Sequence, residues 1–225
     1  MENNHKYTAI KGQELVLTYK IRQPLVKTTN PGLLILLHGV GSNEDDLFRF
    51  ADTLPPHFIV VSARAPYTIC PGRYAWFRVD FSSGKPVIDP EQAEKSRQVL
   101  NLFTSQLMER YEVNPTEVYM GGFSQGGIMS YSTGLTHPQK FKGIFILSSR
   151  LLPEVKPLIN PGPALQKLRV FIAHGIADQV LPLPHAHEAK AYLDNLTPDI
   201  TYHEYRIGHQ VDTRELADLN NWLLS

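Results

Sequence analysis

The sequence contains very little cysteine and no long hydrophobic run, and each absence excludes a class of protein. Cys70 is the one cysteine among 225 residues, so no disulfide can form within the chain. The longest apolar runs, such as LLILL at residues 33–37, are far shorter than the roughly 20 residues of a membrane-spanning helix. The N-terminal stretch MENNHKYTAI lacks the apolar core of a secretory signal. We therefore expect a cytoplasmic protein with no stable membrane insertion.

The chain also lacks a net charge. Lysine plus arginine and aspartate plus glutamate each number 22, so no overall field favours nucleic acid or an anionic membrane. Internal repeats, low-complexity tracts and Ser/Gly linkers are absent, and the length suits one large α/β domain. We expect a single domain over residues 1–225 that binds no nucleic acid. Whether it assembles into a homo-oligomer stays open.

The chain does contain a regular alternation of short apolar segments and longer helical patterns. Inner strands are expected at 33–38, 58–63, 117–121, 143–148, 169–174 and 201–207, and helices at 44–53, 91–111, 125–136, 184–195 and 211–224. Most of these strands are continuous apolar runs, which is typical of a parallel sheet with helices on both faces. Residues 14–21 alternate more, so we expect an antiparallel edge strand there. The pattern predicts a three-layer α/β fold with a mostly parallel central sheet.

Two segments, 64–90 and 149–167, are too long to be simple connections. Loops of this length in a compact domain are usually functional or disordered. Their large apolar residues argue against disorder, so we expect lid or pocket loops. The side chains predicted to line a substrate pocket are Trp76, Phe77, Leu151 and Leu152. Simple packing of these side chains into the core is an equally open alternative.

A serine among glycines follows the strand expected at 117–121. Residues 122–126 are Gly-Phe-Ser-Gln-Gly, and a helical pattern begins directly after them. Between a strand and a helix, G-x-S-x-G is typical of a sharp turn that exposes a nucleophilic serine, here Ser124. A glycine-rich turn without a chemical role is the alternative. A phosphate-binding loop is not supported, because no G-x-x-x-x-G-K-[ST] pattern is present.

A serine nucleophile needs a base, and the base needs an acid that orients it. Asp178 lies in the loop after the strand expected at 169–174, and His209 follows the strand expected at 201–207. Parallel strands bring their carboxyl ends to one edge of a sheet, and the order Ser, Asp, His is that of α/β hydrolases. Taken singly, Asp178 could cap a helix and His209 could lie in a loop without a role. Their joint occurrence favours a catalytic triad.

A hydrolase of this kind also needs an oxyanion hole. The strand expected at 33–38 ends in a loop with glycines at 39 and 41, which let the backbone turn inward. The predicted donors are the backbone N–H groups of Val40, in this loop, and Gln125, directly after the nucleophile.

The remaining strand-end histidines are expected to be structural. His38 and His174 each precede a glycine, and we expect their rings to bond to the backbone. His185 and His187 are spaced i, i+2, which places them on different sides of a helix, whereas a helical zinc pair needs i, i+4. We expect no metal and no organic cofactor.

Four stretches, in this order, resemble the phospholipase/carboxylesterase group of α/β hydrolases, which includes acyl-protein thioesterases and small bacterial esterases. They are LLHGVGSNEDDL, GGFSQGG, HGIADQVLP and GHQV, and the resemblance extends from about Leu33 to Leu224. It implies a nucleophile, an acid and a base at Ser124, Asp178 and His209. It also implies oxyanion donors at Val40 and Gln125. Residues 76–77 resemble the aromatic pair that the family has near the substrate entrance.

Several positions depart from the family pattern. Gly127 stands where alanine commonly follows the elbow, and Arg78 stands where aspartate often follows the Trp-Phe pair. After the strand expected at 143–148 the family usually has Leu-Ser-Gly, whereas this chain has Leu-Ser-Ser-Arg at 147–150. None of these positions belongs to the predicted triad.

The sequence therefore predicts a serine hydrolase that cleaves small-molecule carboxylic esters or thioesters through an acyl-enzyme intermediate. Carboxylesterases, lysophospholipases and acyl-thioesterases all fit this description. A serine peptidase of the same fold is an alternative, although 225 residues leave little room for a large cap. A non-catalytic binding protein with this fold is a second alternative, but it has no reason to retain all three triad residues.

Overall fold

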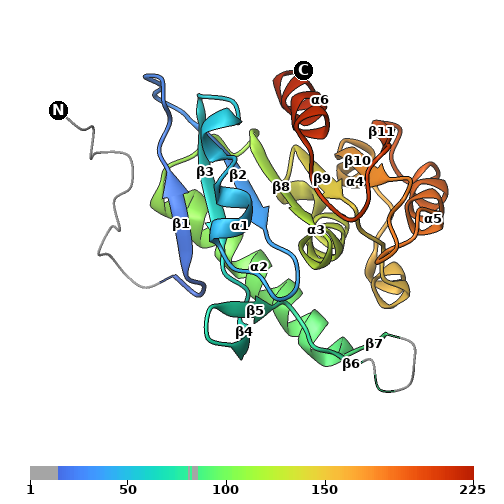
Figure 1. Ribbon diagram of the computed structural model, residues 1–225. Coiled ribbons are helices and arrows are strands. Elements are labelled where there is room, and N and C mark those ends of the chain that lie inside the picture. The colour runs from blue at the N-terminus through green and yellow to red at the C-terminus, as the bar shows by residue number, and fades with distance from the viewer. Residues whose placement is uncertain (1–14, 81, 83–85) are drawn as a thin grey trace.

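The computed structural model describes residues 15–80, 82 and 86–225, and a seven-stranded sheet lies at its centre (Figure 1). The strand order is β1-β3-β2-β8-β9-β10-β11. The bounds are β1 (Tyr19–Arg22), β2 (Gly32–Leu37), β3 (Phe58–Ala63), β8 (Val118–Phe123), β9 (Gly143–Leu147), β10 (Arg169–Gly175) and β11 (Ile200–Tyr205). All six predicted inner strands are therefore present, with their ends within about two residues.

The first strand differs in direction from the others. β1 pairs antiparallel with β3, whereas every other pair of neighbours in this sheet is parallel. The predicted antiparallel edge strand is thus confirmed, although it begins at residue 19 and the predicted residue 14 lies outside the described residues. The Arg22 guanidinium at its end is fully buried and donates to backbone carbonyls between β1 and β3, including Ala51 O and Phe58 O. These bonds tie the edge strand to the body of the fold.

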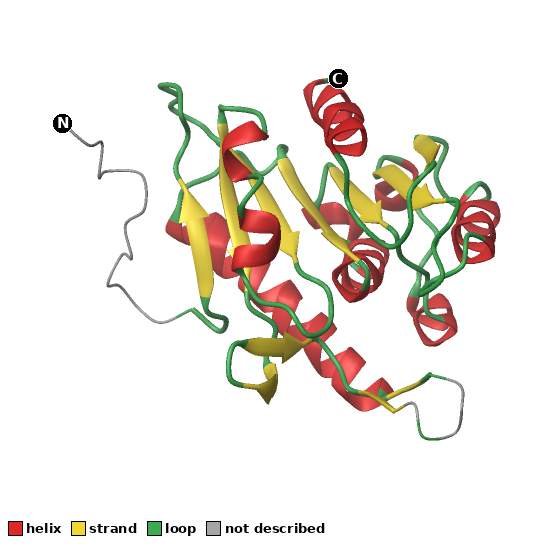
Figure 2. Cartoon of the chain, viewed as in Figure 1, coloured by secondary structure: helices red, strands yellow, loops and turns green. Residues whose placement is uncertain are grey.

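Helices cover both faces of the sheet (Figures 1 and 2). One face carries α2 (Pro90–Arg110), α3 (Gln125–Thr136) and α5 (Pro184–Leu193), and the other carries α1 (Asp45–Phe48), the 3-10 helix η1 (Ala51–Thr53) and α6 (Thr213–Leu224). The strand side chains alternate between these layers, since Leu33, Ile35 and Leu37 belong to one hydrophobic cluster and Leu34 and Leu36 to the other. Both faces of the inner strands are buried, which is why their sequences are apolar without a break.

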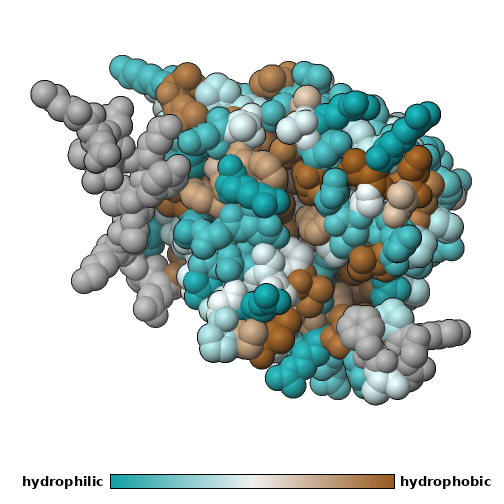
Figure 3. Space-filling view, in the orientation of Figure 1, coloured by the Kyte–Doolittle hydropathy of each residue, from teal (hydrophilic) through white to brown (hydrophobic). Residues whose placement is uncertain are grey.

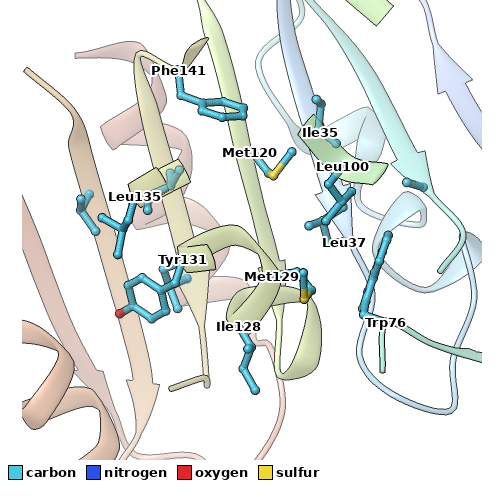
Figure 4. Close-up of a cluster of buried hydrophobic side chains, with 14 of the residues drawn as sticks. Ile35, Leu37, Trp76, Leu100, Met120, Ile128, Met129, Tyr131, Leu135 and Phe141 are labelled. Atoms are coloured by element: carbon cyan, nitrogen blue, oxygen red, sulfur yellow. The ribbon is translucent and has the colours of Figure 1, made fainter. Parts of the chain in front are cut away.

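The cluster between the sheet and helices α2 and α3 forms the larger part of the core (Figure 4). Leu37, Leu100, Met120 and Met129 are each fully buried within it. Burying one such side chain stabilises the fold by about 1.5–3 kcal/mol relative to leaving it exposed. This packing supports the turn between β8 and α3.

Two helices begin directly after an aspartate that caps them. The side chain of Asp89 accepts a hydrogen bond from Gln92 N ahead of α2, and Asp212 Oδ1 accepts from Glu215 N ahead of α6. Such caps typically stabilise a helix by about 1 kcal/mol. The single helix predicted at 44–53 is wrong, because α1 and η1 are separate short turns. The proline at position 55 holds Leu54 in an extended conformation, which limits any helix before it.

The two long connections contain structure of their own. The first holds two hairpins, β4 (Tyr67–Cys70) with β5 (Arg73–Ala75) and β6 (Val79–Asp80) with β7 (Val87–Ile88). The second holds the 3-10 helix η3 (Pro153–Leu158) and the short helix α4 (Pro163–Gln166), while η2 (Pro138–Lys140) lies between α3 and β9. On the face drawn in Figure 3, hydrophobic residues form separate groups among hydrophilic ones.

Glu215, in the first turn of α6, is a fully buried acid. Burial raises the pKa of Glu215 to about 8 from 4.5. A hydrogen bond from the Asp212 backbone lowers this pKa in part, and the negative charge of Asp212 adds to the rise. The folded state therefore keeps a proton that the unfolded chain loses. Its stabilising effect is complete below about pH 4.5 and is lost as the pH rises to about 8.

We expect Glu215→Gln to remove this pH dependence, because the amide has no proton to release in that range. The wild type should lose roughly 1.4 kcal/mol of unfolding free energy per pH unit from this group, and the variant should not. Chemical denaturation at several pH values between 4.5 and 8 measures the slope. The exposed Glu91→Gln is the control and should keep the wild-type slope. Equal slopes in all three proteins would contradict the buried acid.

Candidate active site

The turn between β8 and α3 holds Ser124 in an unusual backbone conformation, with φ of 55° and ψ of −118°. A positive φ is uncommon outside glycine, and such strain persists only where the surroundings fix it. Ser124 N donates to Leu147 O at 2.9 Å, and Ser124 O accepts from Ile128 N at 3.1 Å. The hydroxyl of Ser149 donates to the same carbonyl oxygen at 2.7 Å. Backbone bonds to β9 and α3 and a side-chain bond thus hold the strained residue.

The flanking glycines are required by close packing against β2. A Cβ added to Gly122 would lie 2.3 Å from Leu37 O, and one added to Gly126 would lie 1.9 Å from the same oxygen. Real Cβ atoms essentially never come within 3.0 Å of another heavy atom in such contacts. The end of β2 therefore lies directly against the turn, and no side chain fits at either position. This contact gives the G-x-S-x-G pattern its physical reason.

The three residues of the predicted triad come together above the carboxyl ends of the strands. His209 Nε2 lies 2.9 Å from Ser124 Oγ, and His209 Nδ1 lies 2.7 Å from Asp178 Oδ2. A carboxylate has no proton to give, so Nδ1 donates to Asp178 and Nε2 is left to accept the serine proton. The other carboxylate oxygen, Asp178 Oδ1, accepts from Val180 N at 2.9 Å and Leu181 N at 2.8 Å. The imidazole thus holds the tautomer that a general base needs.

The loops that carry Asp178 and His209 are bonded to each other. Ala177 N donates to Ile207 O at 3.0 Å, beside Asp178. A Cβ on Gly175 would lie 2.4 Å from Gly208 O, so the end of β10 is packed tightly against the residue before His209. The Phe123 ring lies 4.7 Å from the imidazole of His209, measured between centroids. The position of the imidazole is therefore fixed from several sides.

Two backbone N–H groups beside Ser124 have no hydrogen-bond acceptor among residues 15–80, 82 and 86–225. They belong to Val40 and Gln125, the predicted oxyanion donors. A Cβ on Gly39 would lie 3.5 Å from Ser124 Cβ, so the loop after β2 passes directly beside the serine. The Gln125 N–H opens helix α3, where the partial positive charge of the helix terminus favours an anionic oxygen. The site thus offers unused donors next to a hydroxyl.

The Gln125 side chain has a structural role that the sequence did not predict. Its Oε1 accepts from Trp76 N at 2.8 Å, and its Nε2 donates to Phe77 O at 2.7 Å. The Trp76 indole in turn donates to His38 O at 3.0 Å, just ahead of the Val40 loop. The Trp76-Phe77 segment therefore links the two sides of the proposed oxyanion hole. No local sequence signal marks these contacts, because they join residues about 40 to 50 positions apart.

The four residues predicted to line a substrate pocket are all buried in one hydrophobic cluster. Trp76, Phe77 and Leu152 are at most 1% exposed, and Leu151 is 8% exposed. This arrangement agrees with the packing alternative, and their predicted role in substrate binding stays a prediction. A groove of about 330 Å³ lies between the start of α2, α3 and η3, and of these four residues only Leu152 lines it.

The other strand-end histidines bond to the backbone, as the sequence predicted. His38 Nε2 accepts from Ala65 N at 3.1 Å, so its Nδ1 donates to Gly39 O at 2.7 Å. His174 Nε2 lies 2.7 Å from Leu181 O. Burial lowers the pKa of both rings.

Among the residues that the structure describes, no group of three or more His, Cys, Asp or Glu side chains could hold a metal ion. In that same part of the chain, no helix has the length and apolar content to cross a membrane.

Solved structures with the same architecture identify the fold of this chain. The carboxylesterase of Mesorhizobium loti has a TM-score of 0.80 at 20% identity, over 98% of this chain and 99% of its own. The carboxylesterase of Bacillus cereus has a TM-score of 0.76 at 24% identity, over 92% of this chain and 93% of its own. The predicted three-layer α/β-hydrolase fold is thereby confirmed.

The family model described as Phospholipase/Carboxylesterase matches residues 20–224, and the chain belongs to this family. Acyl-protein thioesterase 1 of Emericella nidulans is 30% identical over 149 residues, which is 64% of this chain. That match spans 62% of the length of the relative. The resemblance inferred from the four sequence stretches is confirmed.

The contact between the turn and β2 predicts the effect of a single methyl group. Gly126→Ala should place its Cβ against Leu37 O and destabilise the fold by about 1–3 kcal/mol or more, with loss of the Ser124 conformation. Thermal unfolding and esterase assays measure the two effects. The matched control is Gly162→Ala, where an added Cβ meets nothing within 4 Å. A Gly126→Ala protein as stable as this control would contradict the contact.

Proposed function

We propose that this chain is a serine hydrolase that cleaves carboxylic ester or thioester bonds of small-molecule substrates. The observation that carries the proposal is the continuous hydrogen-bonded line from Ser124 Oγ through His209 to Asp178, at 2.9 and 2.7 Å. Membership of the Phospholipase/Carboxylesterase family supports it. The proposal includes a single domain, because the proposed catalytic residues all follow strands of one sheet. It also includes a cytoplasmic location.

In the proposed mechanism, Ser124 Oγ attacks the carbonyl carbon while His209 Nε2 takes the hydroxyl proton. The electron pair of the broken C=O π bond moves to the oxygen, which accepts hydrogen bonds from the Val40 and Gln125 N–H groups. Asp178 stabilises the positive imidazolium that forms. When the tetrahedral intermediate collapses, the C–O or C–S bond breaks and His209 returns its proton to the leaving group. A water molecule then releases the acyl group from Ser124 by the same steps.

The apolar surroundings of the site favour substrates with an apolar acyl or leaving group. Val40 is 48% exposed beside its proposed donor N–H, and Ile176 and Val180, which flank Asp178 in the chain, are 47% and 65% exposed. Small-molecule sites are lined mainly by apolar side chains with a few polar groups among them. Simple esters and thioesters fit this environment better than a charged substrate.

Ser124→Ala tests the proposal directly. Hydrolysis of p-nitrophenyl esters should fall by roughly 10³-fold or more, because among the described residues Ser124 alone offers a hydroxyl to His209. Labelling by a fluorophosphonate probe should disappear in the same variant. The exposed Ser82→Ala is the control and should keep both activities. Persistent hydrolysis and labelling in Ser124→Ala would refute the proposed nucleophile, and absence of both in the wild type would favour a non-catalytic binding protein.

Asp178→Asn removes the carboxylate charge beside His209 and keeps the shape of the side chain. An asparagine amide in place of the carboxylate favours the wrong imidazole tautomer, so kcat should fall by roughly 10⁴-fold with little change in the position of the ring. The variant should be assayed with a p-nitrophenyl ester at saturating substrate, beside its melting temperature. A kcat within tenfold of the wild type would contradict the role of Asp178.

A peptide amide series on the wild type distinguishes the serine peptidase alternative, since a peptidase should turn over these amides.

A further inference from the structure

Ser149 is a buried hydroxyl in direct contact with the nucleophile turn. It lies two residues after β9 and is 2% exposed. Its Oγ donates to Ser124 O at 2.7 Å. The residue between, Ser148, has φ of 45°, so the chain bends sharply where it leaves the strand. The triad and the oxyanion donors do not include Ser149.

The carbonyl that Ser149 binds belongs to the same peptide unit as the Gln125 N–H. A peptide unit is planar, so a hydrogen bond that fixes its C=O also fixes the direction of its N–H. Such a bond also polarises the unit, which strengthens the N–H as a donor by about 10–30%. Ile128 N reaches the same oxygen at 3.1 Å, and Ser149 supplies the second and shorter bond.

The place of Ser149 depends on a neighbour that has no side chain. A Cβ on Gly127 would lie 2.6 Å from Ser149 Cβ and 2.8 Å from Ser149 Oγ. Gly127 and Ser149 are two of the positions at which the chain departs from the family pattern of alanine and glycine. Positions 127 and 149 are therefore adjacent. A side chain at position 149 occupies the space that a side chain at position 127 would need.

We propose that Ser149 is a positioning residue for the oxyanion hole, which orients the Ser124–Gln125 peptide so that the Gln125 N–H points at the developing oxyanion. This inference rests on the proposed function. It explains a buried hydroxyl that the hydrolytic mechanism does not otherwise use. It also explains why a glycine occupies position 127, beyond the glycines that β2 requires.

Ser149→Ala tests the inference, because it removes the donor and keeps most of the volume. We expect kcat for a p-nitrophenyl ester to fall about two- to tenfold with KM unchanged, the effect of losing one hydrogen bond in the transition state. The Ki of a trifluoromethyl ketone with the same acyl chain should rise by the same factor, since its adduct carries an oxyanion. A purely structural role would lower the melting temperature without this matched change.

Two further variants keep the result interpretable. Gly127→Ala/Ser149→Gly removes the clash between the two side chains and leaves the new Cβ 3.0 Å from Gly122 O, so it should fold and still show the lower kcat. Ser148→Ala is the matched control, because its buried hydroxyl has no hydrogen-bond partner within the described residues, and it should keep the wild-type kcat.

The outcomes separate this inference from the proposed function. A wild-type enzyme that is active and labelled by the fluorophosphonate, with wild-type kcat and Ki in Ser149→Ala or in the double variant, overturns the positioning role alone. An equal loss in Ser148→Ala also overturns it. A wild-type protein that is neither active nor labelled overturns both proposals.

Discussion

The contact between the end of β2 and the turn after β8 is the constraint on which the site depends. Leu37 O lies so close to the turn that Gly122 and Gly126 have no room for a Cβ. This approach forces the backbone of Ser124 to a positive φ and brings the Val40 loop beside it. If the strand and the turn were an ångström further apart, the serine could relax, and the loop that carries Val40 would no longer pass directly beside it. The packing of β2 against the turn therefore also sets the geometry of the site.

The rest of the site is held by bonds between loops that follow different strands. The loops after β10 and β11 bond through Ala177 and Ile207, which keeps Asp178 and His209 together. The Gln125 side chain joins the turn to residues 76–77 of the first long connection. Each loop alone would be mobile, because exposed connections carry few constraints of their own. Together they form a rigid surround for a strained residue, which is what preorganised hydrogen-bond donors require.

The sequence predicted the layers of the fold and much of the candidate site, for identifiable reasons. Continuous apolar runs revealed the inner strands, since burial on both faces leaves no polar positions, and the strand order in space had no local signal. The helix predicted at 44–53 failed because the segment divides at residues 49–50 into α1 and η1, and the apolar periodicity carried no signal of that break. The sequence allowed us to predict Ser124, Asp178 and His209, because each follows a strand. It did not allow us to predict the contacts of Gln125 and Ser149, because these depend on the path of long connections in space.

The contact between Gly127 and Ser149 restricts the order in which these positions can change during evolution. An alanine at 127 and a serine at 149 exclude each other, since the added Cβ would lie 2.6 Å from its neighbour. A chain with alanine at 127 and glycine at 149 would therefore have to lose the methyl group before position 149 could accept a serine. The passable intermediate has glycine at both positions, with a small void beside the elbow. The reverse exchange passes through the same intermediate, because the serine at 149 must be lost before a methyl group can return to position 127.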